Sequence, residues 1–245
     1  MRRVIPNKTD TVIFDLDGTL VDSQPAALGA TIEALSQFGV QVTAAELREV
    51  FGGGARKLMG HFLERDLGAG QADQALESAV RLRAGLQLEL ISETLLLPGV
   101  KELMVSLKDS KYKLAVATMS SRAVVDSVLE FHGIGPYFDV VLTIDDVTKG
   151  KPDPEILIKV VDCLGGQVDC SLYVGDSSHD LEAALNLGMP FLLVDSGLYV
   201  RGEARKKLRA DAEHNGFPMV GIGELLDIAE IVQRHHLSSP ETPIA

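Results

Sequence analysis

The stretch Asp15-Leu16-Asp17-Gly18-Thr19-Leu20-Val21-Asp22-Ser23 decides how the chain folds. It directly follows the short apolar run Thr11–Phe14. A short run of β-branched and aromatic residues that stops at polar residues is typical of a buried parallel strand. Gly18 allows the backbone to turn tightly just after two acids. The stretch therefore predicts a first buried strand that ends in a closely spaced pair of carboxylates.

Four further apolar runs have the same character, and helical patterns lie between them. Val124, Val125, Val128 and Leu129, for example, recur at helical spacing. Alternating strands and helices predict an α/β fold with a Rossmann-like, doubly wound parallel sheet. The further predicted strands are Leu114–Thr118, Val140–Ile144, Leu172–Val174 and Phe191–Val194.

One interval interrupts this alternation. Residues 24–94 contain no convincing strand and are rich in helix-forming residues, and Pro98-Gly99 marks the return to the alternating pattern. We therefore predict a core domain of residues 1–23 and 95–245 and an inserted helical cap domain of residues 24–94. An insertion after the first strand lies where open α/β sheets bind their ligands, so it is a candidate lid.

The other predicted strands also end at polar residues. Because the carboxyl ends of neighbouring parallel strands meet at one edge of the sheet, we expect these segments to converge with Asp15 and Asp17. Clustered carboxylates repel unless a proton or a cation is bound, and a set of oxygen ligands without His or Cys favours Mg²⁺. The converging segments are Thr118-Met119-Ser120, Lys149–Pro154 and Gly175–Asp180.

These four segments, in this order, resemble the motifs of the haloacid dehalogenase superfamily in its phosphatase branch. The resemblance spans Asp15 to Asp180 and implies a Rossmann-like core with the first strand central and an α-helical cap. It also implies that Asp15 is the nucleophile and Asp17 the general acid/base. By the same resemblance, Thr118 and Lys151 bind the phosphoryl group, and Lys151 shields Asp15. Lys151 is preferred to Lys149 because the family lysine directly precedes a proline.

The resemblance further implies a Mg²⁺ site. Asp15 and Asp176 are the expected carboxylate ligands, Asp17 contributes its backbone carbonyl, and Asp180 supports the site or orients its waters. Asp22 is expected only to cap the exit into the insertion. Thus Mg²⁺ is the predicted cofactor.

Asp17 also discriminates among reactions. Dehalogenase and phosphonatase relatives lack an acid at this position. Relatives similar to β-phosphoglucomutase keep it but usually have Glu-Asp in the fourth motif, whereas this chain has Gly175-Asp176, as in phosphoglycolate phosphatase-like and pyrophosphatase-like members. Met119 replaces the asparagine that many phosphoglycolate phosphatase-like members carry after the threonine. We place Met119 with the substrate-binding residues and expect Thr118 and the local amides to bind the phosphoryl group.

The cap is expected to select the substrate. Phe51–Arg56 is a glycine-rich turn at the position of the family's specificity loop, and we hypothesise that Arg56 binds a second anionic group of the substrate. His61 fits either packing or a substrate contact. The natural substrate is left open by the sequence.

Composition restricts the partners. The 245 residues include 23 Lys+Arg and 35 Asp+Glu, a net charge of −12, which argues against a basic nucleic-acid-binding face or a polybasic membrane anchor. Two cysteines and no apolar leader favour a cytoplasmic protein. We expect a small phosphorylated metabolite as partner, no nucleic acid, no membrane, and a monomer or homodimer.

The favoured function is thus Mg²⁺-dependent hydrolysis of the phosphate monoester of a small metabolite, through an aspartyl phosphate. The alternatives are β-phosphoglucomutase-like phosphoryl transfer and hydrolysis of inorganic pyrophosphate. A non-catalytic binding protein on the same fold ranks low, because no acid among Asp15, Asp17 and Asp176 is missing.

Overall fold

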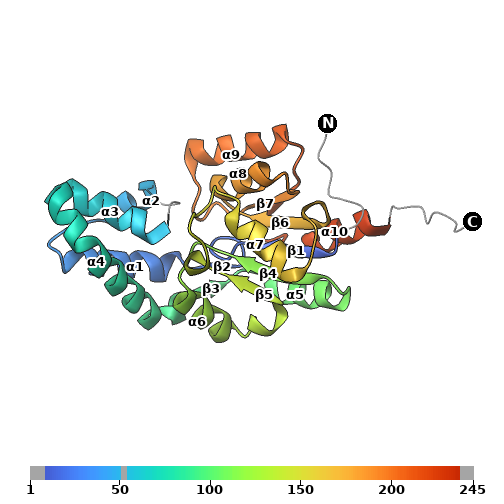
Figure 1. The fold of residues 1–245 in the computed structure, drawn as a ribbon, viewed down its shortest axis with the longest axis horizontal. Helices are drawn as coiled ribbons and strands as arrows, with labels where there is room; N and C mark the ends of the chain where they lie inside the picture. Colours follow the sequence, from blue (N-terminus) through green and yellow to red (C-terminus); the bar gives the residue numbers. More distant parts are fainter. Residues whose placement is uncertain (1–8, 51–53, 238–245) are drawn as a thin grey trace, which may run out of the picture.

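A computed structural model describes residues 9–50 and 54–237 (Figure 1). Its centre is a six-stranded sheet in the order β5-β4-β1-β6-β7-β8, with every neighbouring pair parallel. The predicted α/β class and the interior position of the first strand are confirmed. The strands are β1 (Thr11–Phe14), β4 (Lys113–Ala117), β5 (Val140–Leu142), β6 (Ser171–Gly175), β7 (Phe191–Asp195) and β8 (Met219–Gly221).

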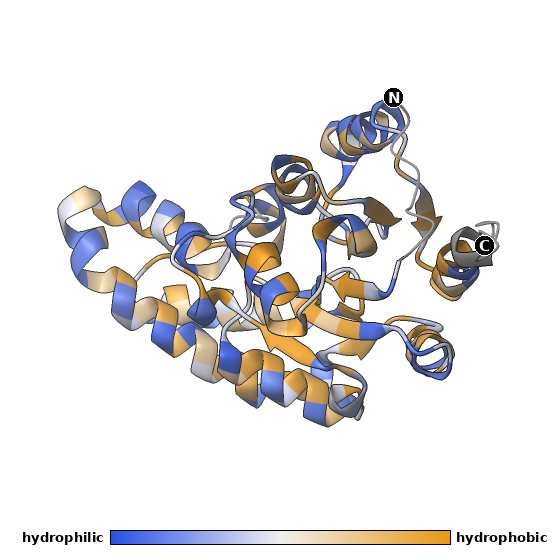
Figure 2. Ribbon diagram, turned by 45° about the vertical axis from the view of Figure 1, so that its right-hand side comes forward, coloured by the Kyte–Doolittle hydropathy of each residue, from blue (hydrophilic) through white to orange (hydrophobic). Residues whose placement is uncertain are grey.

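Helices cover both faces of this sheet. Side chains alternate along a strand, so Val12 and Phe14 pack on one face with α5, α6 and α10, while Ile13 packs on the other with α7, α8 and α9. Figure 2 shows largely hydrophobic strands surrounded by helices that alternate hydrophobic and hydrophilic residues. The helices are α5 (Val100–Asp109), α6 (Arg122–His132), α7 (Glu155–Leu164), α8 (Ser178–Leu187), α9 (Gly202–His214) and α10 (Asp227–Leu237).

Four more helices, here called the cap helices, lie beside the sheet between β1 and α5 in the sequence (Figure 1). They enclose a separate hydrophobic cluster that includes Leu35, Met59 and Phe62. The division into two domains at residues 23/24 and 94/95 stays a prediction. The cap helices are α1 (Gln24–Ser36), α2 (Ala44–Val50), α3 (Gly54–Leu67) and α4 (Ala69–Glu89), and the short 3₁₀ helix η1 (Ile91–Glu93) follows them.

The two segments that connect the cap helices to the core pair with each other. β2 (Val21–Asp22) and β3 (Leu95–Leu96) form a two-stranded antiparallel sheet that the sequence patterns did not predict. Asp22 accepts a hydrogen bond of 3.0 Å from the backbone N–H of Gln24, the first residue of α1, while Ser23 occupies the N-cap position. This contact agrees with the expected role of Asp22 at the exit into the insertion.

Some predicted boundaries shift by one or two residues. β5 ends at Leu142 rather than Ile144, because Thr143 caps the 3₁₀ helix η3 (Ile144–Asp146) with its side chain. Two further 3₁₀ helices occupy connections in the core, η2 (Gly135–Tyr137) and η4 (Val168–Cys170). No helix within the described residues is both long and apolar enough to cross a membrane.

Candidate active site

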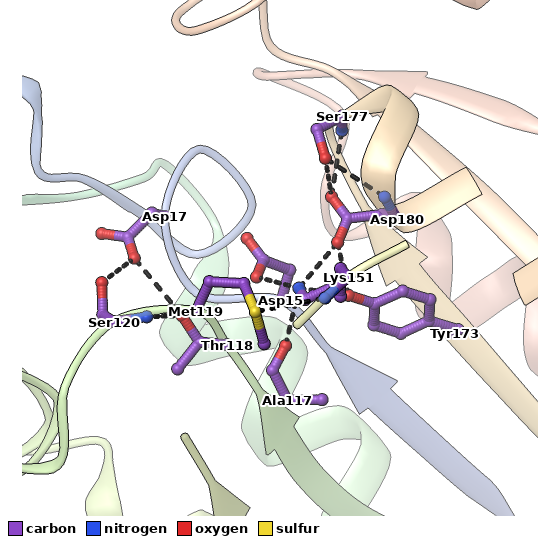
Figure 3. Close-up of polar contacts among 10 residues, drawn as sticks. All are labelled: Asp15, Asp17, Ala117, Thr118, Met119, Ser120, Lys151, Tyr173, Ser177 and Asp180. Carbon is purple, nitrogen blue, oxygen red and sulfur yellow. Dashed lines mark hydrogen bonds and ion pairs between the residues drawn. The ribbon is translucent and has the colours of Figure 1, made fainter. Parts of the chain in front are cut away.

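The carboxyl ends of β1, β4 and β6 bring the predicted residues of the core together with Lys151 (Figure 3). Asp15 follows β1, and its N–H donates to the Val174 carbonyl of β6 at 2.8 Å. Thr118 follows β4, and its N–H donates to the Leu142 carbonyl of β5 at 3.1 Å. Because these strands are adjacent and parallel, the residues directly after them share one edge of the sheet.

The Lys151 ammonium lies at the centre of this edge. It donates to Asp15 Oδ1 and Asp180 Oδ1, both at 2.7 Å, and contacts the Tyr173 hydroxyl at 2.7 Å and the Ala117 carbonyl at 2.9 Å. The side chain is only 3% exposed. An ammonium has three N–H donors, so these four oxygens occupy all of them. Lys151 therefore neutralises part of the acid charge and fixes the orientation of Asp15 and Asp180.

The loop that carries Lys151 is itself held in place. The Lys151 backbone N–H donates to the Met119 sulfur at 3.3 Å. The Glu155 carboxylate accepts from the Thr148 N–H at 3.1 Å. Hydrogen bonds from Lys159 and Thr148 lower the pKa of Glu155 to about 2, so this anchor is ionised at neutral pH. Met119 thus supports the Lys151 loop, and its predicted substrate contact stays a prediction.

Asp180 has a structural and an electrostatic role. It forms a capping box with Ser177 at the start of α8, accepting from the Ser177 hydroxyl at 2.5 Å, and it also accepts from the Tyr173 hydroxyl at 2.5 Å. Burial would raise the pKa of Asp180, but Lys151 and these hydroxyls outweigh burial and lower it. Asp180 is therefore ionised and paired with Lys151.

Asp15, Asp176 and Asp180 form a buried acidic cluster. One oxygen of each lies within 4.8 Å of the others, and all three residues are buried. Burial raises the pKa of Asp15 to about 7, although Lys151 opposes the shift; burial together with the charges of Asp180 and Asp15 raises the pKa of Asp176 well above its usual value. The single charge of Lys151 does not compensate three carboxylates. This oxygen-only donor set fits a hard divalent cation, which would supply the missing positive charge.

Gly18 brings the first motif against this cluster. Its φ is +85°, and a Cβ atom there would lie 2.1 Å from Asp176 Oδ2. The residue must therefore be glycine, both for its backbone conformation and for the close approach of the chain to Asp176. The Ser196 hydroxyl, in the loop after β7, donates to the same Asp176 oxygen at 3.1 Å.

Asp17 faces a different set of groups. The Ser120 hydroxyl donates to Asp17 Oδ2 at 2.7 Å, and the Thr118 hydroxyl lies 3.4 Å from the same oxygen. The Ser23 hydroxyl donates to Asp17 Oδ1 and lies 2.7 Å from the Tyr199 hydroxyl. Figure 3 shows Asp17 with Ser120 and Thr118 on one side of Asp15 and the Lys151 contacts on the other. The predicted use of the Asp17 carbonyl as a metal ligand stays a prediction.

The predicted cap residues lie at the surface. Arg56, in the first turn of α3, is 63% exposed and forms an ion pair with Glu77 of α4. His61 is exposed, with its ring against Phe62 at 4.9 Å between centroids. Residues 51–53 of the glycine-rich turn lie outside the described residues. Neither Arg56 nor His61 contacts the acidic cluster, and their roles toward substrate stay predictions.

Several polar partners at the site were not assigned from the sequence. Ser120 belongs to a predicted converging segment but was given no role, and Ser196 follows a strand, so the rule that strand ends carry function could have identified it. Tyr173 lies within an apolar strand, so the sequence pattern indicates only a buried aromatic residue and does not reveal the role of its hydroxyl. Ser23 and Tyr199 approach each other only through the fold, 176 positions apart.

Comparisons with known proteins agree with this architecture. The family model of haloacid dehalogenase-like hydrolases matches residues 12–194. A phosphoglycolate phosphatase of Caulobacter vibrioides is 33% identical over 76% of this chain and 79% of its own. The solved structure of a predicted phosphoglycolate phosphatase from Haemophilus somnus has a TM-score of 0.76 at 25% identity, covering 90% of this chain and 98% of its own.

A β-phosphoglucomutase from Clostridium difficile shares the fold, with a TM-score of 0.76 at 19% identity over 93% of this chain and 97% of its own. The fold and the strand-end motifs define a hydrolase with a Rossmann-like α/β core. The chain belongs to the haloacid dehalogenase-like hydrolase family.

Proposed function

We propose that this chain is a Mg²⁺-dependent phosphatase that hydrolyses the phosphate monoester of a small metabolite, with phosphoglycolate phosphatase-like chemistry. The observation that carries the proposal is the buried contact of Lys151 with Asp15 and Asp180 beside Asp176. A nucleophilic carboxylate, a fixed cation and a site for a divalent cation meet at one point. The names of the sequence relatives support the same activity.

The reaction would proceed in two displacements. In the first, an Asp15 oxygen attacks phosphorus, the bond from phosphorus to the ester oxygen breaks, and Asp17 gives its proton to the leaving oxygen. In the second, Asp17 takes a proton from water, the water oxygen attacks phosphorus, and the bond to Asp15 breaks. Free phosphate leaves and Asp15 is regenerated.

The surrounding residues stabilise charge during both displacements. Lys151 keeps Asp15 oriented and offsets negative charge on the phosphoryl oxygens, and Thr118 is positioned beside Asp17 to bind those oxygens. A divalent cation held by Asp15, Asp176 and Asp180 would supply further charge neutralisation at the phosphoryl group.

Gly175 favours hydrolysis over the mutase alternative. A Cβ atom at this position would lie 2.6 Å from the Asp180 Cβ. The glutamate typical of β-phosphoglucomutase-like relatives therefore has no room here unless Asp180 moves away from Lys151. No observation of this kind among the described residues favours the hydrolysis of pyrophosphate.

A screen of phosphate esters tests the function. We expect Mg²⁺-loaded protein to release free phosphate from p-nitrophenyl phosphate and from phosphoglycolate, the latter with kcat/KM of about 10⁴ M⁻¹ s⁻¹ or more. Phosphorus NMR of glucose 1-phosphate reactions should show no isomerised sugar phosphate. Isomerisation would favour the mutase alternative, and a protein that releases phosphate from no ester would contradict the proposal.

Metal removal gives a separate prediction. Chelation by EDTA followed by desalting should lower kcat about 10³-fold, because the acidic cluster then lacks the charge that stabilises the transition state. Added Mg²⁺ should restore activity and raise the melting temperature, since it binds the folded state only. Full activity in the chelated protein would show that the cluster works without a metal.

A further inference from the structure

Arg83 is a deeply buried charge among the cap helices. Arg83 is 8% exposed and lies on the face of α4 that contacts α1. Its Nε donates to the Thr31 hydroxyl at 2.8 Å, and its Nη1 donates to Gln87 Oε1 at 2.9 Å. Both acceptors are neutral, so they orient the guanidinium without compensating its charge.

No carboxylate in the described part of the chain forms an ion pair with Arg83. Two of its five N–H donors are used by Thr31 and Gln87, which leaves three donors on Nη1 and Nη2. Two of these can bind both oxygens of one anionic group in a bidentate arrangement. A buried charge is costly unless it is paired. We therefore infer that the anion that pairs with the Arg83 guanidinium comes from a bound ligand.

Arg83 faces α1, the helix that leads away from the reaction centre. Its partner Thr31 lies about two turns into α1, which begins directly after Ser23, and the Ser23 hydroxyl donates to Asp17. The charge of Arg83 interacts with Asp17 and Tyr199, which belong to the core and hydrogen-bond to Ser23. Burial lowers the pKa of Arg83, yet a guanidinium stays protonated in proteins. Lys151 cannot bind a second anion, because its donors are already directed to protein oxygens.

The contrast with Arg56 supports this assignment. Arg56 is 63% exposed and paired with Glu77, so its charge is both solvated and compensated. An exposed ion pair offers a substrate little binding energy. Arg83 is buried and oriented by two hydrogen bonds, and no carboxylate among the described residues is in direct contact with it.

We propose that Arg83 is a specificity-determining residue, which binds a second anionic group of the substrate while the phosphoryl group is bound at Asp15. The substrate class is then a phosphate monoester that carries a second anion, either a carboxylate or another phosphate. The inference rests on the proposed phosphatase function.

Kinetics on three matched esters test it: phosphoglycolate carries a carboxylate, ethylene glycol bisphosphate a second phosphate, and 2-hydroxyethyl phosphate no second anion. Arg83→Met should lower kcat/KM about 10- to 100-fold for the ester whose second anion is that of the true substrate, mainly through KM. It should leave 2-hydroxyethyl phosphate within about threefold. Arg83→Lys should recover part of the loss. The control is Arg81→Met, an exposed arginine on the same helix, expected to match wild type.

Binding gives a readout that does not need turnover. Calorimetry on Asp15→Asn protein should show tighter binding of the ester that carries a second anion than of 2-hydroxyethyl phosphate, and Arg83→Met should remove that difference. Arg83→Gln replaces the methionine variant if the latter does not fold.

The outcomes separate the two proposals. Equal losses on all three esters would show that Arg83 has only a structural role. The same conclusion would follow if Arg83→Met kept the ester preference of wild type, and both results would leave the phosphatase function intact. Selective, Arg83-dependent binding without hydrolysis by wild type would support the Arg83 assignment and overturn the phosphatase function. A selective loss in Arg56→Met but not in Arg83→Met would overturn the assignment in favour of Arg56.

Discussion

Asp15→Asn is expected to lower kcat by about 10⁴-fold or more on any phosphate ester that the wild type hydrolyses. The amide has nearly the same shape as the carboxylate but cannot form the bond to phosphorus. The fold should persist, because the change removes one charge from a crowded acidic cluster. Hydrolysis of p-nitrophenyl phosphate measures the loss of kcat. After acid quenching with a labelled substrate, labelled phosphate should stay on the wild-type protein but not on the variant.

Asp22→Asn is the matched control for that experiment. Asp22 lies in the same motif but accepts a hydrogen bond from the first N–H of α1, and the Oδ1 atom of asparagine can accept the same bond. Its activity should stay within about threefold of wild type. An Asp15→Asn protein as active as wild type would contradict the nucleophile assignment and revive the binding-protein alternative.

Lys151→Met is expected to lower activity about 10²- to 10³-fold and the free energy of unfolding by about 3–5 kcal/mol. The substitution leaves Asp15 and Asp180 buried without their cation, and the pKa of Asp15, about 7 even with Lys151 present, rises further. The higher pKa reduces the ionised fraction of Asp15 at neutral pH. Urea unfolding and kcat, each measured with Mg²⁺ present, check the two losses.

Lys149→Met controls for charge in the same loop. The Lys149 side chain is 73% exposed and pairs only loosely with Asp153, at 3.7 Å. It should lose little stability or activity. Comparable losses in both variants would mean that the choice of Lys151 over Lys149 is wrong.

The strands that carry the site could be predicted because their chemistry is local. Thr11–Phe14 is matched residue for residue, and the ends of β4 and β6 differ by one residue. Hydrophobic runs that stop at polar residues reflect burial on both faces of a parallel sheet, so they are visible without any knowledge of contacts.

What the sequence could not predict depends on contacts between distant segments. β2, β3 and β8 have two or three residues each, too short to show a period. Arg83 lies in a helix whose pattern looks amphipathic, and only its burial and its neutral partners distinguish it from the exposed Arg81. The hydroxyls around Asp17 come from three separate loops.

The pairing of β2 with β3 has a consequence for how such proteins diversify. Val21 lies opposite Leu96 and Asp22 opposite Leu95, so the chain leaves and re-enters the core at adjacent points. A segment inserted between those points therefore only needs its two ends to lie side by side. Under the proposed roles, a different insertion at this point would change substrate recognition while the catalytic strands keep their sequence.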